Sequence, residues 1–158
     1  MVFFRFVLTN KQLKPKMAFI LNSGESKMEW YPKKASTAFT AGDLVYADGS
    51  GAIQPADSTS GDHIGVIQKT ITSADSDYAS TTLVPVIKAY QDSIFVADVG
   101  TGTLTTAMIG NRYDLKDANE IDVTATSKKV VEVVGYISAT KALVKINAII
   151  ENNAVATT

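Results

Sequence analysis

From residue 39 onward the chain is a succession of short apolar runs, each ended by a cluster of Gly, Asp or Ser. The runs are rich in Val, Ile, Tyr and Thr, a composition typical of β-strands bounded by turns. We expect strands at residues 44–47, 52–54, 64–69, 82–88, 93–98, 121–124, 130–138 and 143–147. This pattern predicts an all-β fold, either a small β-barrel or a sandwich, with an extended N-terminal arm.

The connections between the runs support the same fold. Asp-Gly-Ser-Gly at residues 48–51 predicts a hairpin turn, because Asp and Gly tolerate positive φ. Ala139 and Thr140 are expected to join the last two strands as a second hairpin. One short helix is expected at residues 104–109, ended by Gly110.

Three residues inside the predicted strands indicate irregular pairing. Gly65 and Gly135 each interrupt an apolar run, which favours a bulge or a close approach between strands. Pro85 lacks a backbone N–H, so its strand is expected at a sheet edge or beside a bulge.

The near-neutral net charge of −1 hides a strong asymmetry along the chain. Residues 1–34 carry seven basic and two acidic groups, a net charge of +5, whereas residues 35–158 carry eight basic and fourteen acidic groups, a net charge of −6. We therefore divide the chain into an N-terminal arm (1–34), a β-barrel domain (35–150) and a C-terminal tail (151–158). A basic arm on an acidic body is typical of an extension that meets a negative surface, although an ordinary solvated segment would give the same count.

The arm carries the candidate partner-binding residues. They combine aromatic rings with positive charges: Phe3, Phe4, Arg5, Phe6, Lys11, Lys14, Lys16, Trp30 and Tyr31. Two alternatives stay open for the phenylalanines, which either dock on a partner or belong to an N-terminal strand of the protein's own sheet. Trp30 and Tyr31 are expected mainly to anchor the arm to the body. The basic residues follow the first apolar run instead of preceding it, so a secretory signal is not expected, and Met17 offers a second start.

The residue types exclude several kinds of chemistry. The sequence has no cysteine, which excludes disulfides and thiolate metal sites, and its single histidine excludes sites that need two imidazoles. Ser58, Ser60, Asp62 and His63 have the residue types of a catalytic triad, but they lie on one turn-rich loop without a nucleophile elbow. We expect no enzyme activity and no catalytic residues.

Ligand-binding motifs are equally weak. Residues 57–62 and 117–122 space several oxygen ligands, yet neither matches a calcium loop. Gly-Thr-Gly at 100–102 lacks the third glycine of a dinucleotide loop. We therefore expect no metal and no cofactor. No nucleic-acid module is visible on the acidic body, and no apolar run approaches the roughly 20 residues of a membrane helix, so neither nucleic acid nor membrane is an expected partner.

A resemblance covers roughly residues 35–148. Phe-Thr-Ala-Gly-Asp-Leu-Val-Tyr from Phe39, Gly-Ala-Ile-Gln-Pro-Ala from Gly51 and His-Ile-Gly-Val-Ile-Gln from His63 are similar to head decoration (cement) proteins of tailed bacteriophages. The stretches at 109–115, 133–137 and 143–146 resemble the C-terminal half of such barrels.

The resemblance implies a late structural protein of the virion that sits on the outer surface of the capsid and stabilises contacts between shell subunits. Its expected partners are the major capsid protein and neighbouring shell subunits, with a trimer of itself or a head fibre as further candidates. Two alternatives remain: the base or adaptor of a head fibre, and a carbohydrate- or surface-binding β module.

Overall fold

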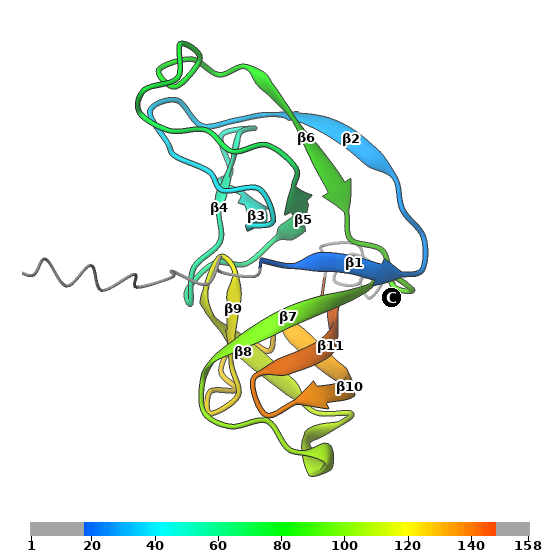
Figure 1. Cartoon of the computed structure of the whole chain (residues 1–158). Helices are drawn as coiled ribbons and strands as arrows, with labels where there is room; N and C mark the ends of the chain where they lie inside the picture. The colour runs from blue at the N-terminus through cyan, green and yellow to red at the C-terminus, as the bar shows by residue number, and fades with distance from the viewer. Residues whose placement is uncertain (1–17, 148–158) are drawn as a thin grey trace, which may run out of the picture.

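The structure is a computed structural model that describes residues 18–147. Eleven strands and one 3-10 turn make up its regular structure, coloured along the chain in Figure 1. Their bounds are β1 Ile20–Ser23, β2 Met28–Pro32, β3 Leu44–Ala47, β4 Ile53–Pro55, β5 His63–Ile67, β6 Leu83–Lys88, β7 Ile94–Thr101, η1 Thr106–Met108, β8 Arg112–Asp117, β9 Glu120–Asp122, β10 Val131–Ser138 and β11 Lys141–Ile146. The strands form two sheets.

The C-terminal strands close into a five-stranded barrel, the lower part of Figure 1. The order is β7-β11-β10-β8-β9, and the ring closes because β9 pairs in parallel with the second half of β7. Strand β1 pairs antiparallel with the first half of β7, along the edge that β9 leaves open. A strand from the start of the described chain is therefore added to the sheet of the barrel.

The other five strands form a sheet in the order β2-β6-β5-β3-β4, the upper part of Figure 1. A single parallel bridge between Lys33 and Ile53 draws its two outer strands together at one end. Lys33 is fully buried there, and its ammonium donates to the carbonyl oxygens of Tyr78 (2.8 Å) and Ser80 (2.5 Å). The lysine thereby fixes the long loop between β5 and β6 against the end of β2.

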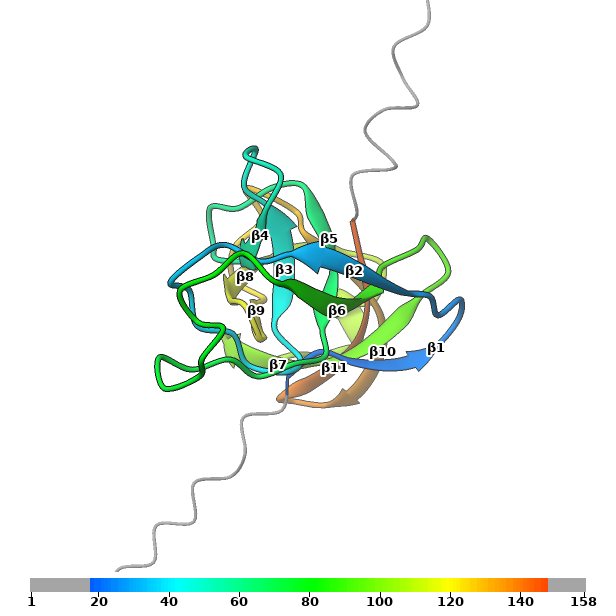
Figure 2. The ribbon, with the colours of Figure 1, turned by 90° about the horizontal axis from the view of Figure 1, so that it is seen from above.

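The two sheets share one hydrophobic core. Phe19, Leu44 and Val66 pack in the same cluster as Phe95 and Val144 of the barrel. A second, smaller cluster that includes Val84 and Val86 fills the interior of the upper sheet. Figure 2 shows the same arrangement from above.

Hydrogen bonds reinforce the junction between the sheets. The turn between β8 and β9 reaches the start of β3, where the Leu44 amide donates to the Ala118 carbonyl (2.6 Å) and the Asn119 side-chain amide donates to Asp43 (3.1 Å). The segment before β1 is tied to the same junction, because the Phe19 amide donates to the Gly42 carbonyl (3.0 Å).

The predicted all-β barrel is confirmed, as are both hairpin turns. The expected helix is a single 3-10 turn at Thr106–Met108. Both glycine predictions are confirmed: the pairing register shifts beside Gly65 and beside Gly135. A Cβ at Gly65 would lie 2.1 Å from the Ile87 carbonyl oxygen, so this position requires glycine for close strand approach.

The prediction for Pro85, a sheet edge or a position beside a bulge, is wrong, because β6 lies between β2 and β5 and neither pairing shifts its register. The Pro85 carbonyl accepts from the Gln68 amide, one residue past the end of β5. In a strand the nitrogen and carbonyl of one residue point the same way, so the missing N–H faces the end of β5 and no β2 hydrogen bond is lost. A proline is therefore tolerated in a central strand.

The predicted boundary of the arm at residue 34 is also wrong for the described part of the chain. Strands β1 and β2 lie before that boundary, yet they pair with β7 and β6. They extend the two sheets through backbone pairing, which the charge count could not reveal. Residues 1–17 and 148–158, which include half of the predicted arm and the whole predicted tail, lie outside the described residues.

Candidate interaction surface

The outer side of the β2–β6 pair is an apolar sheet face. The antiparallel register places Met28 opposite Ile87, Trp30 opposite Pro85 and Pro32 opposite Leu83. Opposed residues share a face, and alternate residues of a strand share a side. All six side chains therefore lie on one side, and all six are apolar; we call this set the β2–β6 face.

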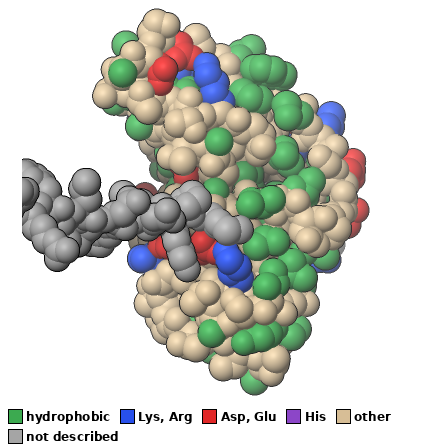
Figure 3. All heavy atoms as spheres, in the orientation of Figure 1, with side chains coloured by type: hydrophobic (Ala, Val, Ile, Leu, Met, Phe, Trp, Pro, Cys, Tyr) green, Lys and Arg blue, Asp and Glu red, His purple; other side chains and the backbone are tan. Residues whose placement is uncertain are grey.

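The opposite side of the same two strands defines which way the β2–β6 face points. Val84 and Val86 are fully buried in the cluster inside the upper sheet, so their side is the inner one. On the β2–β6 face, by contrast, the side chains of Trp30, Leu83 and Met28 are 61%, 58% and 54% exposed. Figure 3 shows hydrophobic atoms gathered over β6 and β2 and continuing toward β1 and β7.

A groove continues the β2–β6 face toward the barrel. It has a volume of about 430 Å³ and lies between the start of β1 and the upper sheet. Its walls are mostly apolar: Ala18, Phe19, Ile20, Leu21, Ala41, Gly42, Gln68 and Ile87. Ile87 belongs to both features, so the face and the groove form one continuous surface.

A charged network borders this surface on the inner side of β2. The Glu29 carboxylate contacts the Lys27 ammonium (2.8 Å) and accepts a hydrogen bond from the Tyr31 hydroxyl (2.6 Å), with Lys88 at 3.5 Å. The hydrogen bonds from Lys27 and Tyr31 lower the pKa of Glu29 to about 2. Burial, followed by the contact with Glu29, raises the pKa of the Tyr31 phenol. The network lies on the inner side of β2 and leaves the outer face apolar.

The structure separates the two predicted site residues that it describes. Trp30 points outward on the β2–β6 face, whereas Tyr31 points inward and packs against the inner cluster. The pair therefore does not act as one anchor: Tyr31 holds β2 to the core, and Trp30 stays accessible. The remaining predicted residues, Phe3, Phe4, Arg5, Phe6, Lys11, Lys14 and Lys16, lie outside the described residues.

The structure brings together two of the residues whose types resembled a triad. The Ser60 hydroxyl and His63 Nε2 are 3.1 Å apart, and both side chains are buried. Ser60 also donates to the Asp57 carbonyl (2.9 Å) and accepts from the Asp57 amide (3.0 Å). The Ser60 hydroxyl has a single proton, which it donates to the Asp57 carbonyl. It therefore accepts a hydrogen bond from His63 Nε2–H, and the two side chains stabilise the turn before β5.

In the oxygen-rich segments considered for metal binding, the carboxylates of Asp57 and Asp122 stabilise turns. The Asp57 carboxylate accepts from the amide and hydroxyl of Thr59, and that of Asp122 accepts from the amide and hydroxyl of Thr124. These are side-chain turns of the kind that Asp commonly makes. Within residues 18–147, no group of three or more Asp, Glu or His side chains is placed to hold a metal ion.

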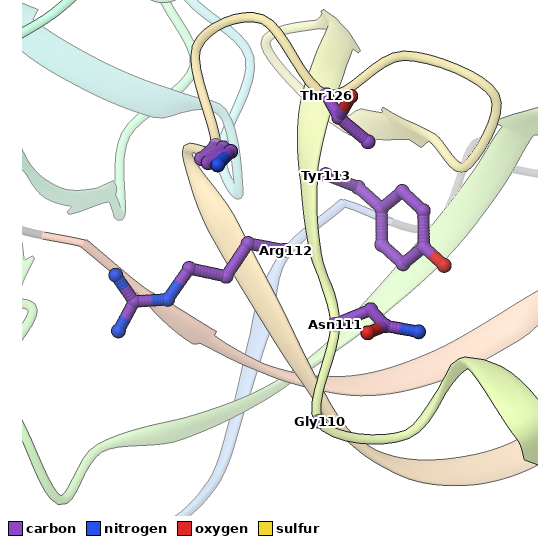
Figure 4. A pocket seen from close by; sticks show the side chains of 6 residues that line it. Gly110, Asn111, Arg112, Tyr113 and Thr126 are labelled. Carbon is purple, nitrogen blue, oxygen red and sulfur yellow. The ribbon is translucent and has the colours of Figure 1, made fainter.

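A second hollow lies on the barrel beside β8, with a volume of about 500 Å³. Figure 4 shows that the Arg112 side chain extends to one side of the strand and the Tyr113 ring to the other. Arg112 also pairs with Glu132 (3.1 Å), and Tyr113 is only 7% exposed. The lining groups do not converge on a common ligand position, and no aromatic platform for a sugar is presented.

Sequence reasoning missed five of the six members of the β2–β6 face: Met28, Pro32, Leu83, Pro85 and Ile87. A signal was available in the run Leu-Val-Pro-Val-Ile at 83–87, which is apolar at every position. Such runs are typical of strands covered on both sides. In the described structure β6 is covered on its inner side, whereas on its outer side only Ile87 packs against a core cluster.

Comparisons with known proteins add no relative. A scan against family models found no match to this chain, and a search of curated proteins found no similar sequence. In the described part of the chain, no helix is long and apolar enough to cross a membrane.

Proposed function

We propose that this protein is an auxiliary capsid protein of a tailed bacteriophage, which binds the outer surface of the assembled head and stabilises contacts between shell subunits. The observation that carries the proposal is the β2–β6 face, where six apolar side chains lie together and Trp30 is 61% exposed. Exposed apolar patches of this kind mark protein interaction sites, and Trp is enriched among the residues that dominate binding energy.

Two further features support the proposal. The sequence over residues 35–148 resembles head decoration proteins, and a small all-β barrel is the architecture that this resemblance implies. Residues 1–17 carry four basic and no acidic side chains, so they offer a second contact element of a different chemical kind. A structural protein that bridges two shell subunits needs two such elements.

The binding mechanism follows from repetition. Each copy on a closed shell contributes only a modest free energy, because many equivalent contacts act on one lattice. Ligands that bind the assembled state and not its separated subunits stabilise the assembly by mass action. The protein is therefore expected to prefer assembled heads over free capsid subunits.

The test uses heads assembled from the major capsid protein of the same phage. A Trp30→Thr/Leu83→Thr variant makes the centre of the β2–β6 face polar while keeping strand-compatible residues. We expect its occupancy on sedimented heads to fall at least about tenfold, the effect of losing roughly 1.4 kcal/mol of binding free energy. The matched control is Tyr136→Thr/Ile137→Thr, which changes two exposed apolar residues of β10 and should leave occupancy unchanged.

Equal binding of both variants and the unmodified protein to heads would contradict this role for the face. Equal binding to heads and to free capsid subunits would contradict the decoration function itself. The head-fibre alternative predicts co-purification with a fibre protein at only some positions of the head. A carbohydrate-binding module predicts retention on a glycan array that the Trp30→Thr change abolishes.

A further inference from the structure

Apart from Ile87, which packs against the core shared with the barrel, the β2–β6 face lacks a covering partner among residues 18–147, although its composition is that of a buried sheet face. Strand β6 is apolar on both sides from Leu83 to Ile87. Its inner side is buried, whereas Leu83 on the outer side is 58% exposed. Polar residues ordinarily occupy the solvent side of an antiparallel pair. We therefore expect an apolar segment to bind the β2–β6 face.

The chain itself contains a segment of matching chemistry. Residues 2–8 read Val-Phe-Phe-Arg-Phe-Val-Leu, six apolar side chains and one arginine. In an extended segment alternate residues share a side, so Val2, Phe4, Phe6 and Leu8 would form one wholly apolar side, with Arg5 on the other. This apolar side is chemically complementary to the β2–β6 face, which presents three apolar side chains from β2 and three from β6.

The attachment point of this segment lies beside the face. Ala18, the first described residue, lines the groove together with Ile87, which is itself a member of the face. Phe19 is buried and hydrogen-bonded to Gly42, so the chain is held firmly at this end. Residues 9–17 form a nine-residue connection with a root-mean-square span of roughly 15–18 Å, comparable with the roughly 20 Å length of a six-residue strand.

Charge favours the same docking. Residues 1–17 carry four basic and no acidic side chains, whereas residues 18–147 carry eleven basic and fifteen acidic side chains, a net charge of −4. The tether also keeps the segment at a millimolar effective concentration near the face. The charge attraction and the high effective concentration both act within one molecule, so docking needs no second copy of the chain.

We propose that, in the free protein, residues 2–8 dock on the β2–β6 face of their own chain, with Phe4 and Phe6 against Trp30 and Leu83. The segment keeps the apolar face covered until a partner surface replaces it. The inference concerns the free protein and rests on the proposed function only for the identity of that partner. Its tests contain no capsid protein, so its failure and that of the proposed function are distinguishable.

The first experiment uses Trp30 as a reporter, because it is the only tryptophan in the chain. We expect acrylamide quenching of the full chain to be weak, and to rise by roughly a factor of two in a Phe4→Ser/Phe6→Ser variant as the docked population falls. A Phe4→Leu/Phe6→Leu control keeps the apolar side and should quench like the unmodified protein. Equal quenching of all three proteins would overturn the proposal.

The second experiment measures proximity directly and exploits the absence of native cysteine. A Phe6→Cys/Leu83→Cys variant should form an intramolecular disulfide under mild oxidation, at a rate independent of protein concentration. A Phe6→Cys/Ile137→Cys variant, with the second cysteine on β10, should form it at least about tenfold more slowly, because its segment is held elsewhere. Disulfide-linked dimers or equal rates in the two variants would overturn docking within one chain.

Discussion

His63 lies at the start of β5 with its ring buried against the turn that holds Ser60. Burial lowers the pKa of this imidazole from 6.5 to about 4, and the nearby carboxylates of Asp62 and Asp57 only partly oppose the shift. The folded protein therefore holds His63 neutral at pH values where the unfolded chain already binds a proton.

This pKa shift predicts a loss of stability on acidification. Between pH 6.5 and pH 4 the unfolded state binds more protons than the folded state, so the free energy of unfolding falls as the pH falls. A shift from 6.5 to about 4 corresponds to about 3 kcal/mol once the pH is below both values. Urea unfolding at a series of pH values measures this change.

A His63→Gln variant isolates the contribution of the histidine. Glutamine keeps a polar group of similar length but does not titrate, so the variant should show a flatter dependence between pH 6.5 and pH 4. Hydrogen bonds lower the pKa of Asp57, so its contribution to the free energy of unfolding is lost only at lower pH, below the ordinary aspartate pKa of 3.8. If the free energy of unfolding of the two proteins changed in parallel between pH 6.5 and pH 4, His63 would not be the group responsible.

Strands β5 and β6 approach each other closely at Gly65. A Cβ built there would lie 2.1 Å from the Ile87 carbonyl oxygen and 2.9 Å from the Lys88 Cα, both backbone atoms that cannot move aside independently. We expect Gly65→Ala to lower the free energy of unfolding by about 2–3 kcal/mol, the scale of overpacking a tight core. Thermal and urea unfolding measure the effect.

Gly61 provides the matched control two residues before β5. A Cβ at Gly61 meets no atom within 4 Å, so Gly61→Ala should be neutral or slightly stabilising through the unfolded state. A Gly65→Ala protein as stable as the Gly61→Ala protein would mean that β6 can move away from β5. In that case the β2–β6 face would be carried on a movable strand.

At the level of elements, the strands that sequence patterns predicted are those bounded by clear turns. The strand at Leu44–Ala47 agrees exactly in its limits with β3, and the hairpin through Ala139 and Thr140 follows from local turn chemistry. Strands β1 and β2 were not predicted, because their pairing partners lie more than fifty residues away along the chain. Long-range pairing of this kind leaves little local signal.

The candidate site, too, has one part that local sequence predicted and one part that depends on long-range pairing. Trp30 was predicted as a site residue from its aromatic character, but its separation from Tyr31 depends on which side of β2 faces the core. The β2–β6 face exists only because β6 lies beside β2, a pairing that joins residues 28–32 to residues 83–87. Composition identified apolar residues in both segments, whereas only the register shows that they form one face.

The molecule as a whole is two sheets joined through a common core and a hydrogen-bonded junction. The groove opens at this junction, and the chain enters the described structure there at Ala18. Ala18 therefore lies beside the groove that borders the β2–β6 face. The position of the entry links the basic N-terminal segment to the proposed shell-binding surface.

Deletion of residues 1–16 tests that link at the scale of the whole molecule. The described structure begins after the deletion, and its anchor at Phe19 remains, so we expect a cooperative thermal transition like that of the full chain. Loss of the cooperative transition would instead place the segment in the structural core. Binding to assembled heads, measured by quantitative gels of purified particles, should weaken.

Two effects of this deletion oppose each other, and their sizes decide the outcome. Removing a cover that is tenfold favoured over the open state would strengthen binding of the face by about 1.4 kcal/mol. Removing six apolar side chains and four positive charges from the contact with the shell costs more, since each buried apolar side chain contributes about 1.5–3 kcal/mol when fully buried. We therefore expect a net loss of occupancy; unchanged or increased occupancy would show that the segment covers the face without binding the shell.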